Sequence, residues 1–290
     1  MSDAVAATHL ALAQRTVRRE PSLLDAIRWE LSKLAAQARA RWTLLVCLVA
    51  PVAIVVIIDA QQRPPKDSLY GRYIHHSGFA VVLLVLGFAA QWVLPLLTAL
   101  VAGDIFASED QHGTWKTVLT RSASRGQLFW AKTITALAFS TAVVLTLAVV
   151  TTVASALIVG HQDLVGLTGQ VIPSGTAARL IVASWATQLA PVFGFTCLAL
   201  LLSVRSRNPA AGIAAPVVLA MVMQLFGGLG GISAIRPLLL TTPFESWHGL
   251  LTEQRFYAPL TTGLIVCGVW CVACLAAARS SLLRRDISGG

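Results

Sequence analysis

The chain has 290 residues, of which 56% are hydrophobic and only 12% are charged. A soluble domain carries about 25% charged residues, so this composition excludes a water-soluble globule. It also excludes a disordered chain, because disordered segments are poor in apolar residues. The composition predicts a membrane protein with several spans, and we attribute the net charge of +9 to basic loops rather than to nucleic-acid binding.

The N-terminal segment, residues 1–41, precedes the first long apolar stretch, so we expect it to be retained rather than cleaved as a signal peptide. Ser22 and Asp25 have the spacing of a capping box, which marks a helix start. Apolar side chains then share one helical stripe: Leu23, Leu24, Ile27, Leu31, Leu34 and Ala38. The pattern predicts an amphipathic helix over about 22–38, lying on the membrane surface or, alternatively, packed against a soluble partner.

Six apolar stretches are long enough to cross a membrane. They run over about 42–58, 78–102, 133–159, 178–202, 210–226 and 260–278. We therefore predict an all-α protein with a transmembrane domain over 42–278 and a tail over 279–290.

The basic residues indicate the orientation of these spans. Six spans place both termini on one side, and that side would carry 16 of the 22 Lys and Arg residues, against six on the other. Because basic loops stay in the cytoplasm, both termini are predicted to be cytoplasmic. Arg outnumbers Lys by 18 to 4, which suggests a GC-rich bacterial genome and hence the bacterial cytoplasmic (inner) membrane.

The segment between the fifth and sixth spans contains Gly227-Gly228-Leu229-Gly230-Gly231, followed by the apolar Leu238–Leu240. Glycines at this density indicate a helix break, after which we expect short outer helices that re-enter the membrane.

Several motifs are absent from the sequence. There is no phosphate-binding GxxxxGK[ST] loop, so the chain does not carry its own ATPase of that type. The interiors of the six predicted spans contain no Asp, Glu, Lys, Arg or His, and Arg179 lies at the end of a span. This pattern disfavours a proton-coupled carrier. The five cysteines lie within apolar runs and are interpreted as packing residues, and no metal site or cofactor is predicted in this chain.

Neutral polar and aromatic residues at membrane depth have two interpretations. They are Gln91, Trp92, Gln188, Phe193, Met221 and Gln224. They either pack and hydrogen-bond between helices or line a path for an amphipathic substrate.

The loop after the second span is the most distinctive region. Gly113 is expected to break the incoming helix, and Thr114 to cap a short helix with Trp115 and Leu119 on one side. Such a helix suits docking into a groove on a cytoplasmic partner, and a merely solvated loop is the alternative.

This loop resembles the signature of the ABC type-2 transporter permeases. The matching residues are Ile105, Ala107, Glu109, Gly113, Thr114, Lys116, Val118, Leu119, Ser124, Arg125 and Lys132. Ser122 departs from the pattern, which usually has proline there, and this leaves the turn after the short helix less defined.

The resemblance implies the membrane-spanning subunit of an ATP-binding-cassette exporter. The neutral, aromatic and methionine residues at membrane depth favour a hydrophobic drug, as in multidrug efflux, a peptide or a lipid as its substrate. It implies an ATPase subunit that binds ATP and Mg, a second permease subunit, and contact with membrane lipid. Residues assigned to coupling with the ATPase are Glu109, Gly113, Thr114, Trp115, Lys116, Val118, Leu119, Arg121 and Arg125. The rival hypothesis is a membrane-embedded immunity, anchoring or assembly factor without transport activity.

Overall fold

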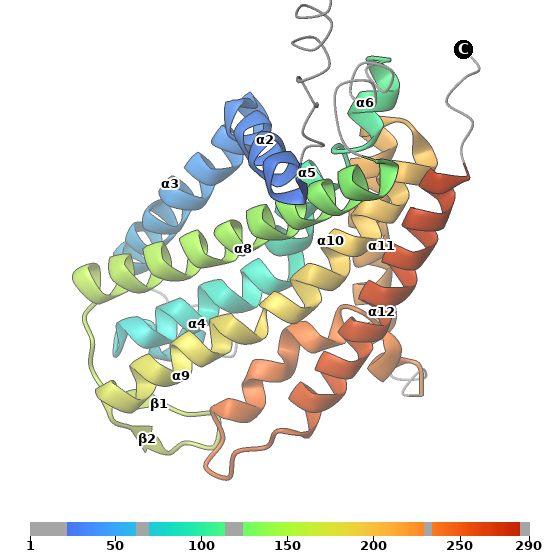
Figure 1. Cartoon of the computed structure of the whole chain (residues 1–290). Coiled ribbons are helices and arrows are strands. Elements are labelled where there is room, and N and C mark those ends of the chain that lie inside the picture. Colours follow the sequence, from blue (N-terminus) through green and yellow to red (C-terminus); the bar gives the residue numbers. More distant parts are fainter. Residues whose placement is uncertain (1–21, 62–69, 114–123, 229–233, 285–290) are drawn as a thin grey trace, which may run out of the picture.

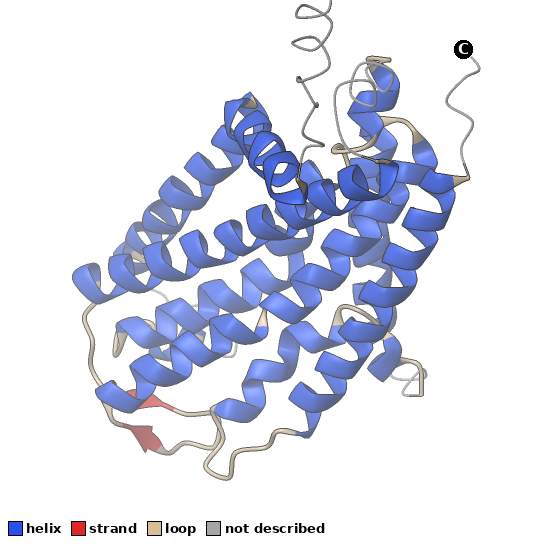
Figure 2. Ribbon diagram, in the orientation of Figure 1, coloured by secondary structure: helices blue, strands red, loops and turns tan. Residues whose placement is uncertain are grey.

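The structure is a computed structural model that describes residues 22–61, 70–113, 124–228 and 234–284. Within these ranges the chain forms a bundle of long helices (Figures 1 and 2). Six of the helices are long and apolar enough to cross a membrane, which confirms the predicted all-α class and number of spans. They run over Ala38–Ala60, Gly78–Gln111, Arg125–Ile158, Ser174–Ser206, Pro209–Gly228 and Ala258–Leu283.

Helix α2 (Leu23–Ala36) precedes the first span, α3 (Ala38–Ala60). The predicted capping box starts it: the Ser22 hydroxyl accepts from the Asp25 amide at 3.2 Å, and the Asp25 carboxylate accepts from the Ser22 amide at 3.1 Å. The buried face of α2 carries Glu30 and Leu34 and packs against α8 (Arg125–Ile158). Leu24, from the predicted apolar stripe, is exposed instead. The face that α2 turns toward the protein therefore includes a carboxylate.

The second span consists of several helical pieces. They are α4 (Gly78–Phe88), the π-helical turn η2 (Ala89–Val93), α5 (Leu94–Ala102) and the short α6 (Ala107–Gln111). In η2 the Leu94 amide donates to the Ala89 carbonyl, five residues back. Pro95 follows and has no N–H to donate, so regular α-helical bonding cannot continue through this point. The wider turn contains Gln91 and Trp92.

The third and fourth spans are joined by a two-stranded hairpin that the sequence did not predict. Helix α8 begins with a capping box between Ser124 and Gln127, several residues before the predicted span. Strands β1 (Leu164–Val165) and β2 (Val171–Ile172) pair antiparallel, with Leu164 opposite Ile172.

The fourth span is broken at Gln188, between α9 (Ser174–Thr187) and α10 (Leu189–Ser206). Pro191 has no N–H to give the carbonyl four residues earlier, which accounts for the break. Helix α10 then packs against α5, α8, α11 (Pro209–Gly228) and α12 (Ala258–Leu283) and so forms the centre of the bundle.

Two short 3-10 helices lie between the fifth and sixth spans, η3 (Arg236–Leu238) and η4 (Thr242–Leu250). A third, η1 (Gly71–Tyr73), precedes the second span. The η4 segment packs between α9 and α12, and burial of Phe244 and Trp247 holds it there. Leu229, Gly230 and Gly231 of the predicted break lie outside the described residues.

Helices α5 and α11 make their closest approach at a glycine pair. A Cβ atom added to Gly212 would overlap the carbonyl oxygen of Gly103, and one added to Gly103 would overlap the carbonyl of Gly212. The neighbouring atoms are backbone, which cannot turn aside as a side chain can. Small residues that allow such approach are typical of contacts between membrane helices.

We expect Gly212→Ala to lower the apparent melting temperature of the detergent-purified chain. The added methyl forces α5 and α11 apart, at a cost of about 1–3 kcal/mol. Gly268→Ala in α12 is the matched control, since a Cβ there meets no described atom within 4 Å. An equal melting temperature for Gly212→Ala and wild type would contradict the close approach.

Candidate functional site

The region from α5 to the start of α8 contains the predicted coupling loop. The structure describes its two flanks, residues 103–113 and 124–132. Six of the predicted coupling residues lie outside the described residues: Thr114, Trp115, Lys116, Val118, Leu119 and Arg121. Glu109, Gly113 and Arg125 can be placed.

Glu109 lies on α6 and is only 2% exposed. The start of α6 is fixed to α10, because the backbone amides of Phe106 and Ala107 both donate to the Ser203 hydroxyl, at 3.2 and 3.1 Å. This contact positions Glu109 inside the protein rather than in a solvated loop.

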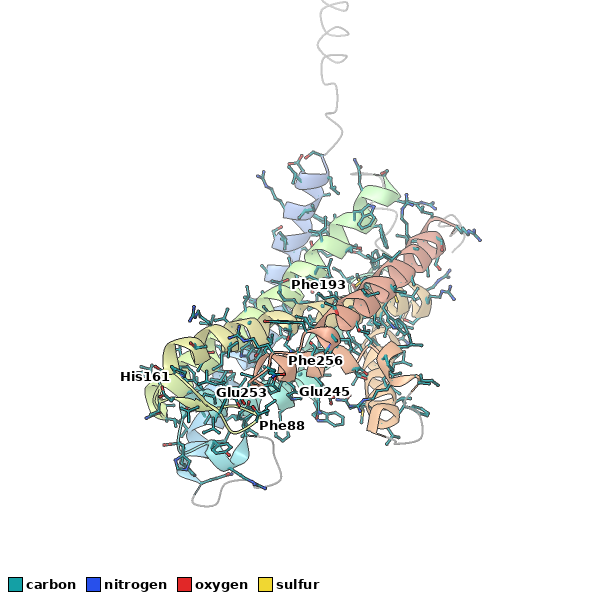
Figure 3. All side chains as sticks on the ribbon, turned by 90° about the horizontal axis from the view of Figure 1, so that it is seen from below. Phe88, His161, Phe193, Glu245, Glu253 and Phe256 are labelled. Atoms are coloured by element: carbon teal, nitrogen blue, oxygen red, sulfur yellow. The ribbon has the colours of Figure 1, made fainter. Side chains whose placement is uncertain are left out.

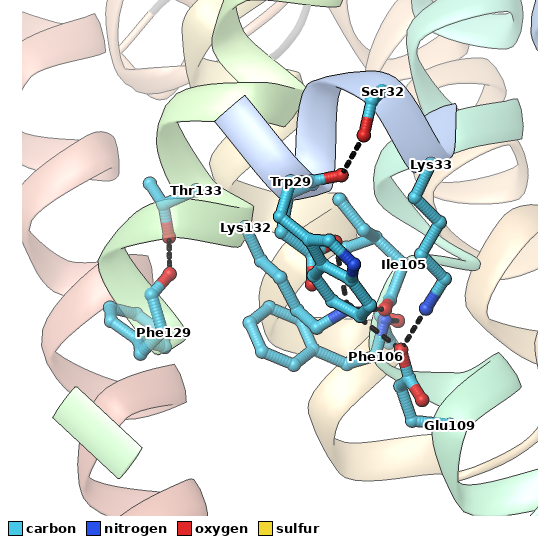
Figure 4. Close-up of polar contacts among 11 residues, drawn as sticks. Trp29, Ser32, Lys33, Ile105, Phe106, Glu109, Phe129, Lys132 and Thr133 are labelled. Atoms are coloured by element: carbon cyan, nitrogen blue, oxygen red, sulfur yellow. Dashed lines mark hydrogen bonds and ion pairs between the residues drawn. The ribbon is translucent and has the colours of Figure 1, made fainter. Parts of the chain in front are cut away.

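Lys132, on the first turns of α8, lies beside Glu109 and is 1% exposed (Figure 4). Its ammonium donates to the Glu109 carboxylate at 3.0 Å, to Glu30 of α2 at 3.2 Å and to the Ile105 carbonyl at 3.1 Å. A lysine has three N–H donors, so these acceptors satisfy it. One buried cation thus joins α2, α6 and α8.

Two further cations complete the pairing at this end of the bundle. Lys33 of α2, about one-third exposed, also pairs with Glu109. Its ammonium lies 5.3 Å from the centre of the Trp29 ring. Arg39 of α3 contacts the buried carboxylate of Asp104 at 2.6 Å.

We call Glu30, Lys33, Glu109 and Lys132 the buried charge cluster. It contains two carboxylates and two ammonium groups, so its formal charge is zero. Burial of a charge is tolerated when it is paired and hydrogen-bonded, and removal of one partner leaves another uncompensated, which typically costs about 3–5 kcal/mol. The cluster therefore holds its helices in one arrangement.

Gly113 and Arg125 lie at the edges of the region that contains the remaining coupling residues. Gly113 follows the end of α6 and has φ of 62°, a left-handed conformation that glycine adopts without strain. The helix ends there, as the sequence predicts. Arg125 is the first residue of α8 and is partly exposed.

The residues predicted to line a substrate path occupy different environments. Gln91 and Gln224 come together in the wall of a cavity of about 160 Å³. Trp92 and Met221 are about half exposed on the bundle surface, where a membrane would surround them.

The other two members of that set lie on or beside α10. Phe193 is partly buried against the core. Gln188 is fully buried, and its side-chain amide donates to the Ser184 and Phe244 carbonyls at 3.3 and 3.4 Å. Gln188 therefore ties the helix break to η4.

The sequence did not identify Glu30, Lys33, Arg39 or Asp104 as site residues. Lys132 was assigned to the motif, but its burial was not foreseen. A usable signal was present in the spacing of Glu30 and Leu34, which share the buried face of α2. Among the described residues, no three His, Cys, Asp or Glu side chains are grouped to hold a metal ion.

Replacement of Lys132 by methionine is expected to lower the apparent melting temperature by several degrees or prevent folding. Methionine fills similar space but leaves Glu30 and Glu109 with one partly exposed cation between them. Arg205→Met, at the exposed end of α10, is the control for loss of one positive charge. If the Lys132→Met chain and the wild type have the same apparent melting temperature, the buried charge cluster contributes nothing to stability.

In a comparison with known protein families, residues 26–227 match the model described as ABC-2 family transporter protein. The matched region is more than half of the chain and includes most of α2, both flanks of the coupling loop and the first five spans. The comparison with curated proteins gives no match. Membrane subunits of this family work with an ABC ATPase, and the six-helix bundle described above fits such a subunit. The chain therefore belongs to the ABC-2 family of transporter proteins.

Proposed function

We propose that the chain is the permease subunit of an exporter driven by ATP hydrolysis on a separate ATPase subunit. Its substrate is amphipathic or hydrophobic, such as a drug, a peptide or a lipid. The observation that carries this proposal is the buried charge cluster. It connects the region of the predicted coupling loop to the transmembrane helices through fully buried ion pairs.

In this mechanism the ATPase binds the loop between α6 and α8 and biases the bundle between two arrangements. A ligand or partner shifts such an equilibrium only by binding one arrangement more tightly than the other. Displacement of the loop moves α6, and the pairs of Glu109 with Lys132 and Lys33 require α8 and α2 to follow. Motion at the loop is thereby converted into motion of the third span.

The orientation follows from the basic residues. The end of the bundle with the buried charge cluster belongs to the side with 16 of the 22 Lys and Arg residues, so we assign it to the cytoplasm of a bacterium. Figure 1 shows α2, α6 and the end of α12 at this same end. Both termini are then cytoplasmic, and η4 and the hairpin face outward.

A second permease subunit, identical or paralogous, completes the transporter in this proposal. Helices α3, α11 and α12 carry many exposed large apolar side chains, which either lipid or a second subunit can cover. The exposed leucines of α2 suit contact with lipid at the cytoplasmic surface.

The docking loop is tested first by co-purification. We expect Trp115→Arg to reduce the amount of ATPase that co-purifies with the permease, because a charge replaces an apolar anchor in the predicted helix. Phe256→Arg is the control: it changes an exposed aromatic residue that belongs to the opposite end of the bundle. If the Trp115→Arg variant co-purifies as much ATPase as the wild type, the proposal that the ATPase docks on this loop is contradicted. A chain that functions with no ATPase would favour the rival immunity, anchoring or assembly role.

Transmission through the buried charge cluster is tested with Lys33→Met in the assembled complex. Lys33 is partly exposed and Glu109 keeps its pair with Lys132, so loss of Lys33 should lower stability less than loss of Lys132, while α2 loses its direct link to Glu109. We expect substrate-stimulated ATPase activity to fall by about fivefold or more. A fivefold change is the lower end of the range that allosteric coupling usually produces. Arg28→Met, an exposed change on the same helix, should keep wild-type stimulation. Equal stimulation in the two variants would contradict transmission through Lys33.

A further inference from the structure

A cavity of about 320 Å³ lies at the end of the bundle opposite the buried charge cluster. Helix α4 and the π-turn form one wall, η4 forms the other, and Tyr70 closes one side. Four aromatic side chains line it: Tyr70, Phe88, Phe244 and Trp247. The volume lies within the range of small-molecule sites, and Figure 3 shows this end with Phe88 and Glu245 labelled.

The aromatic cavity has a carboxylate in its wall. Glu245 is the only Asp, Glu, Lys or Arg among the described residues that line it. Burial lowers the pKa of His248, and the nearby Glu245 carboxylate offsets this only in part, so the neutral form of His248 is favoured. Aromatic faces together with a carboxylate attract an organic cation.

Glu245 also lines a neighbouring cavity, and its carboxylate can still interact with a ligand in the aromatic cavity. Arg236 donates to one oxygen of Glu245 at 3.1 Å, and both side chains are about half exposed. An exposed pair of this kind contributes little, and a carboxylate accepts from several donors at once. Arg236 lines only the smaller cavity of about 160 Å³, where Gln91 and Glu245 are shared between the two.

Tyr70 supplies a second observation that points to a ligand site. Its side chain is 2% exposed, its ring stacks on Trp247 with the centroids 6.3 Å apart, and its hydroxyl has no hydrogen-bond partner among the described residues. Burial raises the pKa of Tyr70, so the hydroxyl keeps its proton. A buried donor without an acceptor is costly, and an acceptor on a bound molecule would remove that cost.

We propose that this cavity binds an amphipathic organic cation. An aromatic or apolar body packs between Phe88, Phe244 and Trp247, a carbonyl or ether oxygen accepts from the Tyr70 hydroxyl, and an ammonium group lies against Glu245. This inference rests on the proposed function, because it names the substrate class of the exporter. Gln91 and Gln224 line the adjoining cavity.

The test is direct binding to the full chain in lipid nanodiscs, without any ATPase. The probes are benzoylcholine, which has an aromatic ring, an ester and an ammonium group, and its uncharged isostere 3,3-dimethylbutyl benzoate. Binding is measured by equilibrium dialysis, with nanodiscs that lack protein as the blank. We expect benzoylcholine to bind at least about tenfold more tightly than the isostere. The two head groups have the same shape, but only the charged one is attracted electrostatically to the carboxylate and the ring faces.

Three variants localise the binding. Glu245→Gln should weaken benzoylcholine binding by about tenfold and leave the isostere unaffected. Tyr70→Phe should weaken both probes by about fivefold, through loss of one hydrogen bond. Glu253→Gln, an exposed carboxylate outside the cavity lining, should bind as wild type.

Equal affinity of wild type for the charged and uncharged probes would overturn the proposal, and this comparison needs no variant to fold. Equal effects of Glu245→Gln and Glu253→Gln would also overturn it, as would undetectable benzoylcholine binding. Because no ATPase is present, these results are independent of coupling. A chain that binds benzoylcholine but recruits no ATPase would support the binding site and contradict the proposed exporter function.

Discussion

Burial of the Lys132 ammonium is the constraint on which the arrangement of α2, α6 and the start of α8 depends. A buried cation requires acceptors on every N–H, and the chain supplies them from positions as distant as 30 and 109. The helix that precedes the first span, the short helix after the second span and the start of the third span must therefore come together. A separate ion pair, between Asp104 and Arg39, joins the second span to α3.

The second span connects the two ends of the molecule. Its first half, α4 and η2, forms a wall of the aromatic cavity, and its second half leads through α5 to Asp104 and Glu109. The π-turn lies between them, where Pro95 interrupts regular helical bonding. Insertions of this kind occur often at functional sites. The second span therefore connects α6 covalently to the wall of the cavity, and the irregular turn lies between them.

Much of this architecture followed from the sequence, and the parts that did not have physical reasons. The six spans were predictable because apolar length is a local property, as was the capping box of Ser22 and Asp25. The pairing of Glu30 with Lys132 was not, because it joins residues 102 apart. The hydrophobic stripe of α2 suggested an apolar contact face, whereas the structure turns Glu30 inward and leaves Leu24 exposed. Gln91 and Gln224 were singled out as polar residues at depth, but only the fold places them in one cavity wall.

The central claim, that buried ion pairs hold α2 to the bundle, is tested most directly by amide hydrogen exchange. Exchange is followed by mass spectrometry on the full chain in nanodiscs, for wild type, Lys132→Met and Glu109→Gln. The account predicts that amides of α2 exchange faster in both variants, because each removes a partner of the buried charge cluster, while those of α12 keep their wild-type rates. Unchanged exchange of α2 in both variants would contradict it.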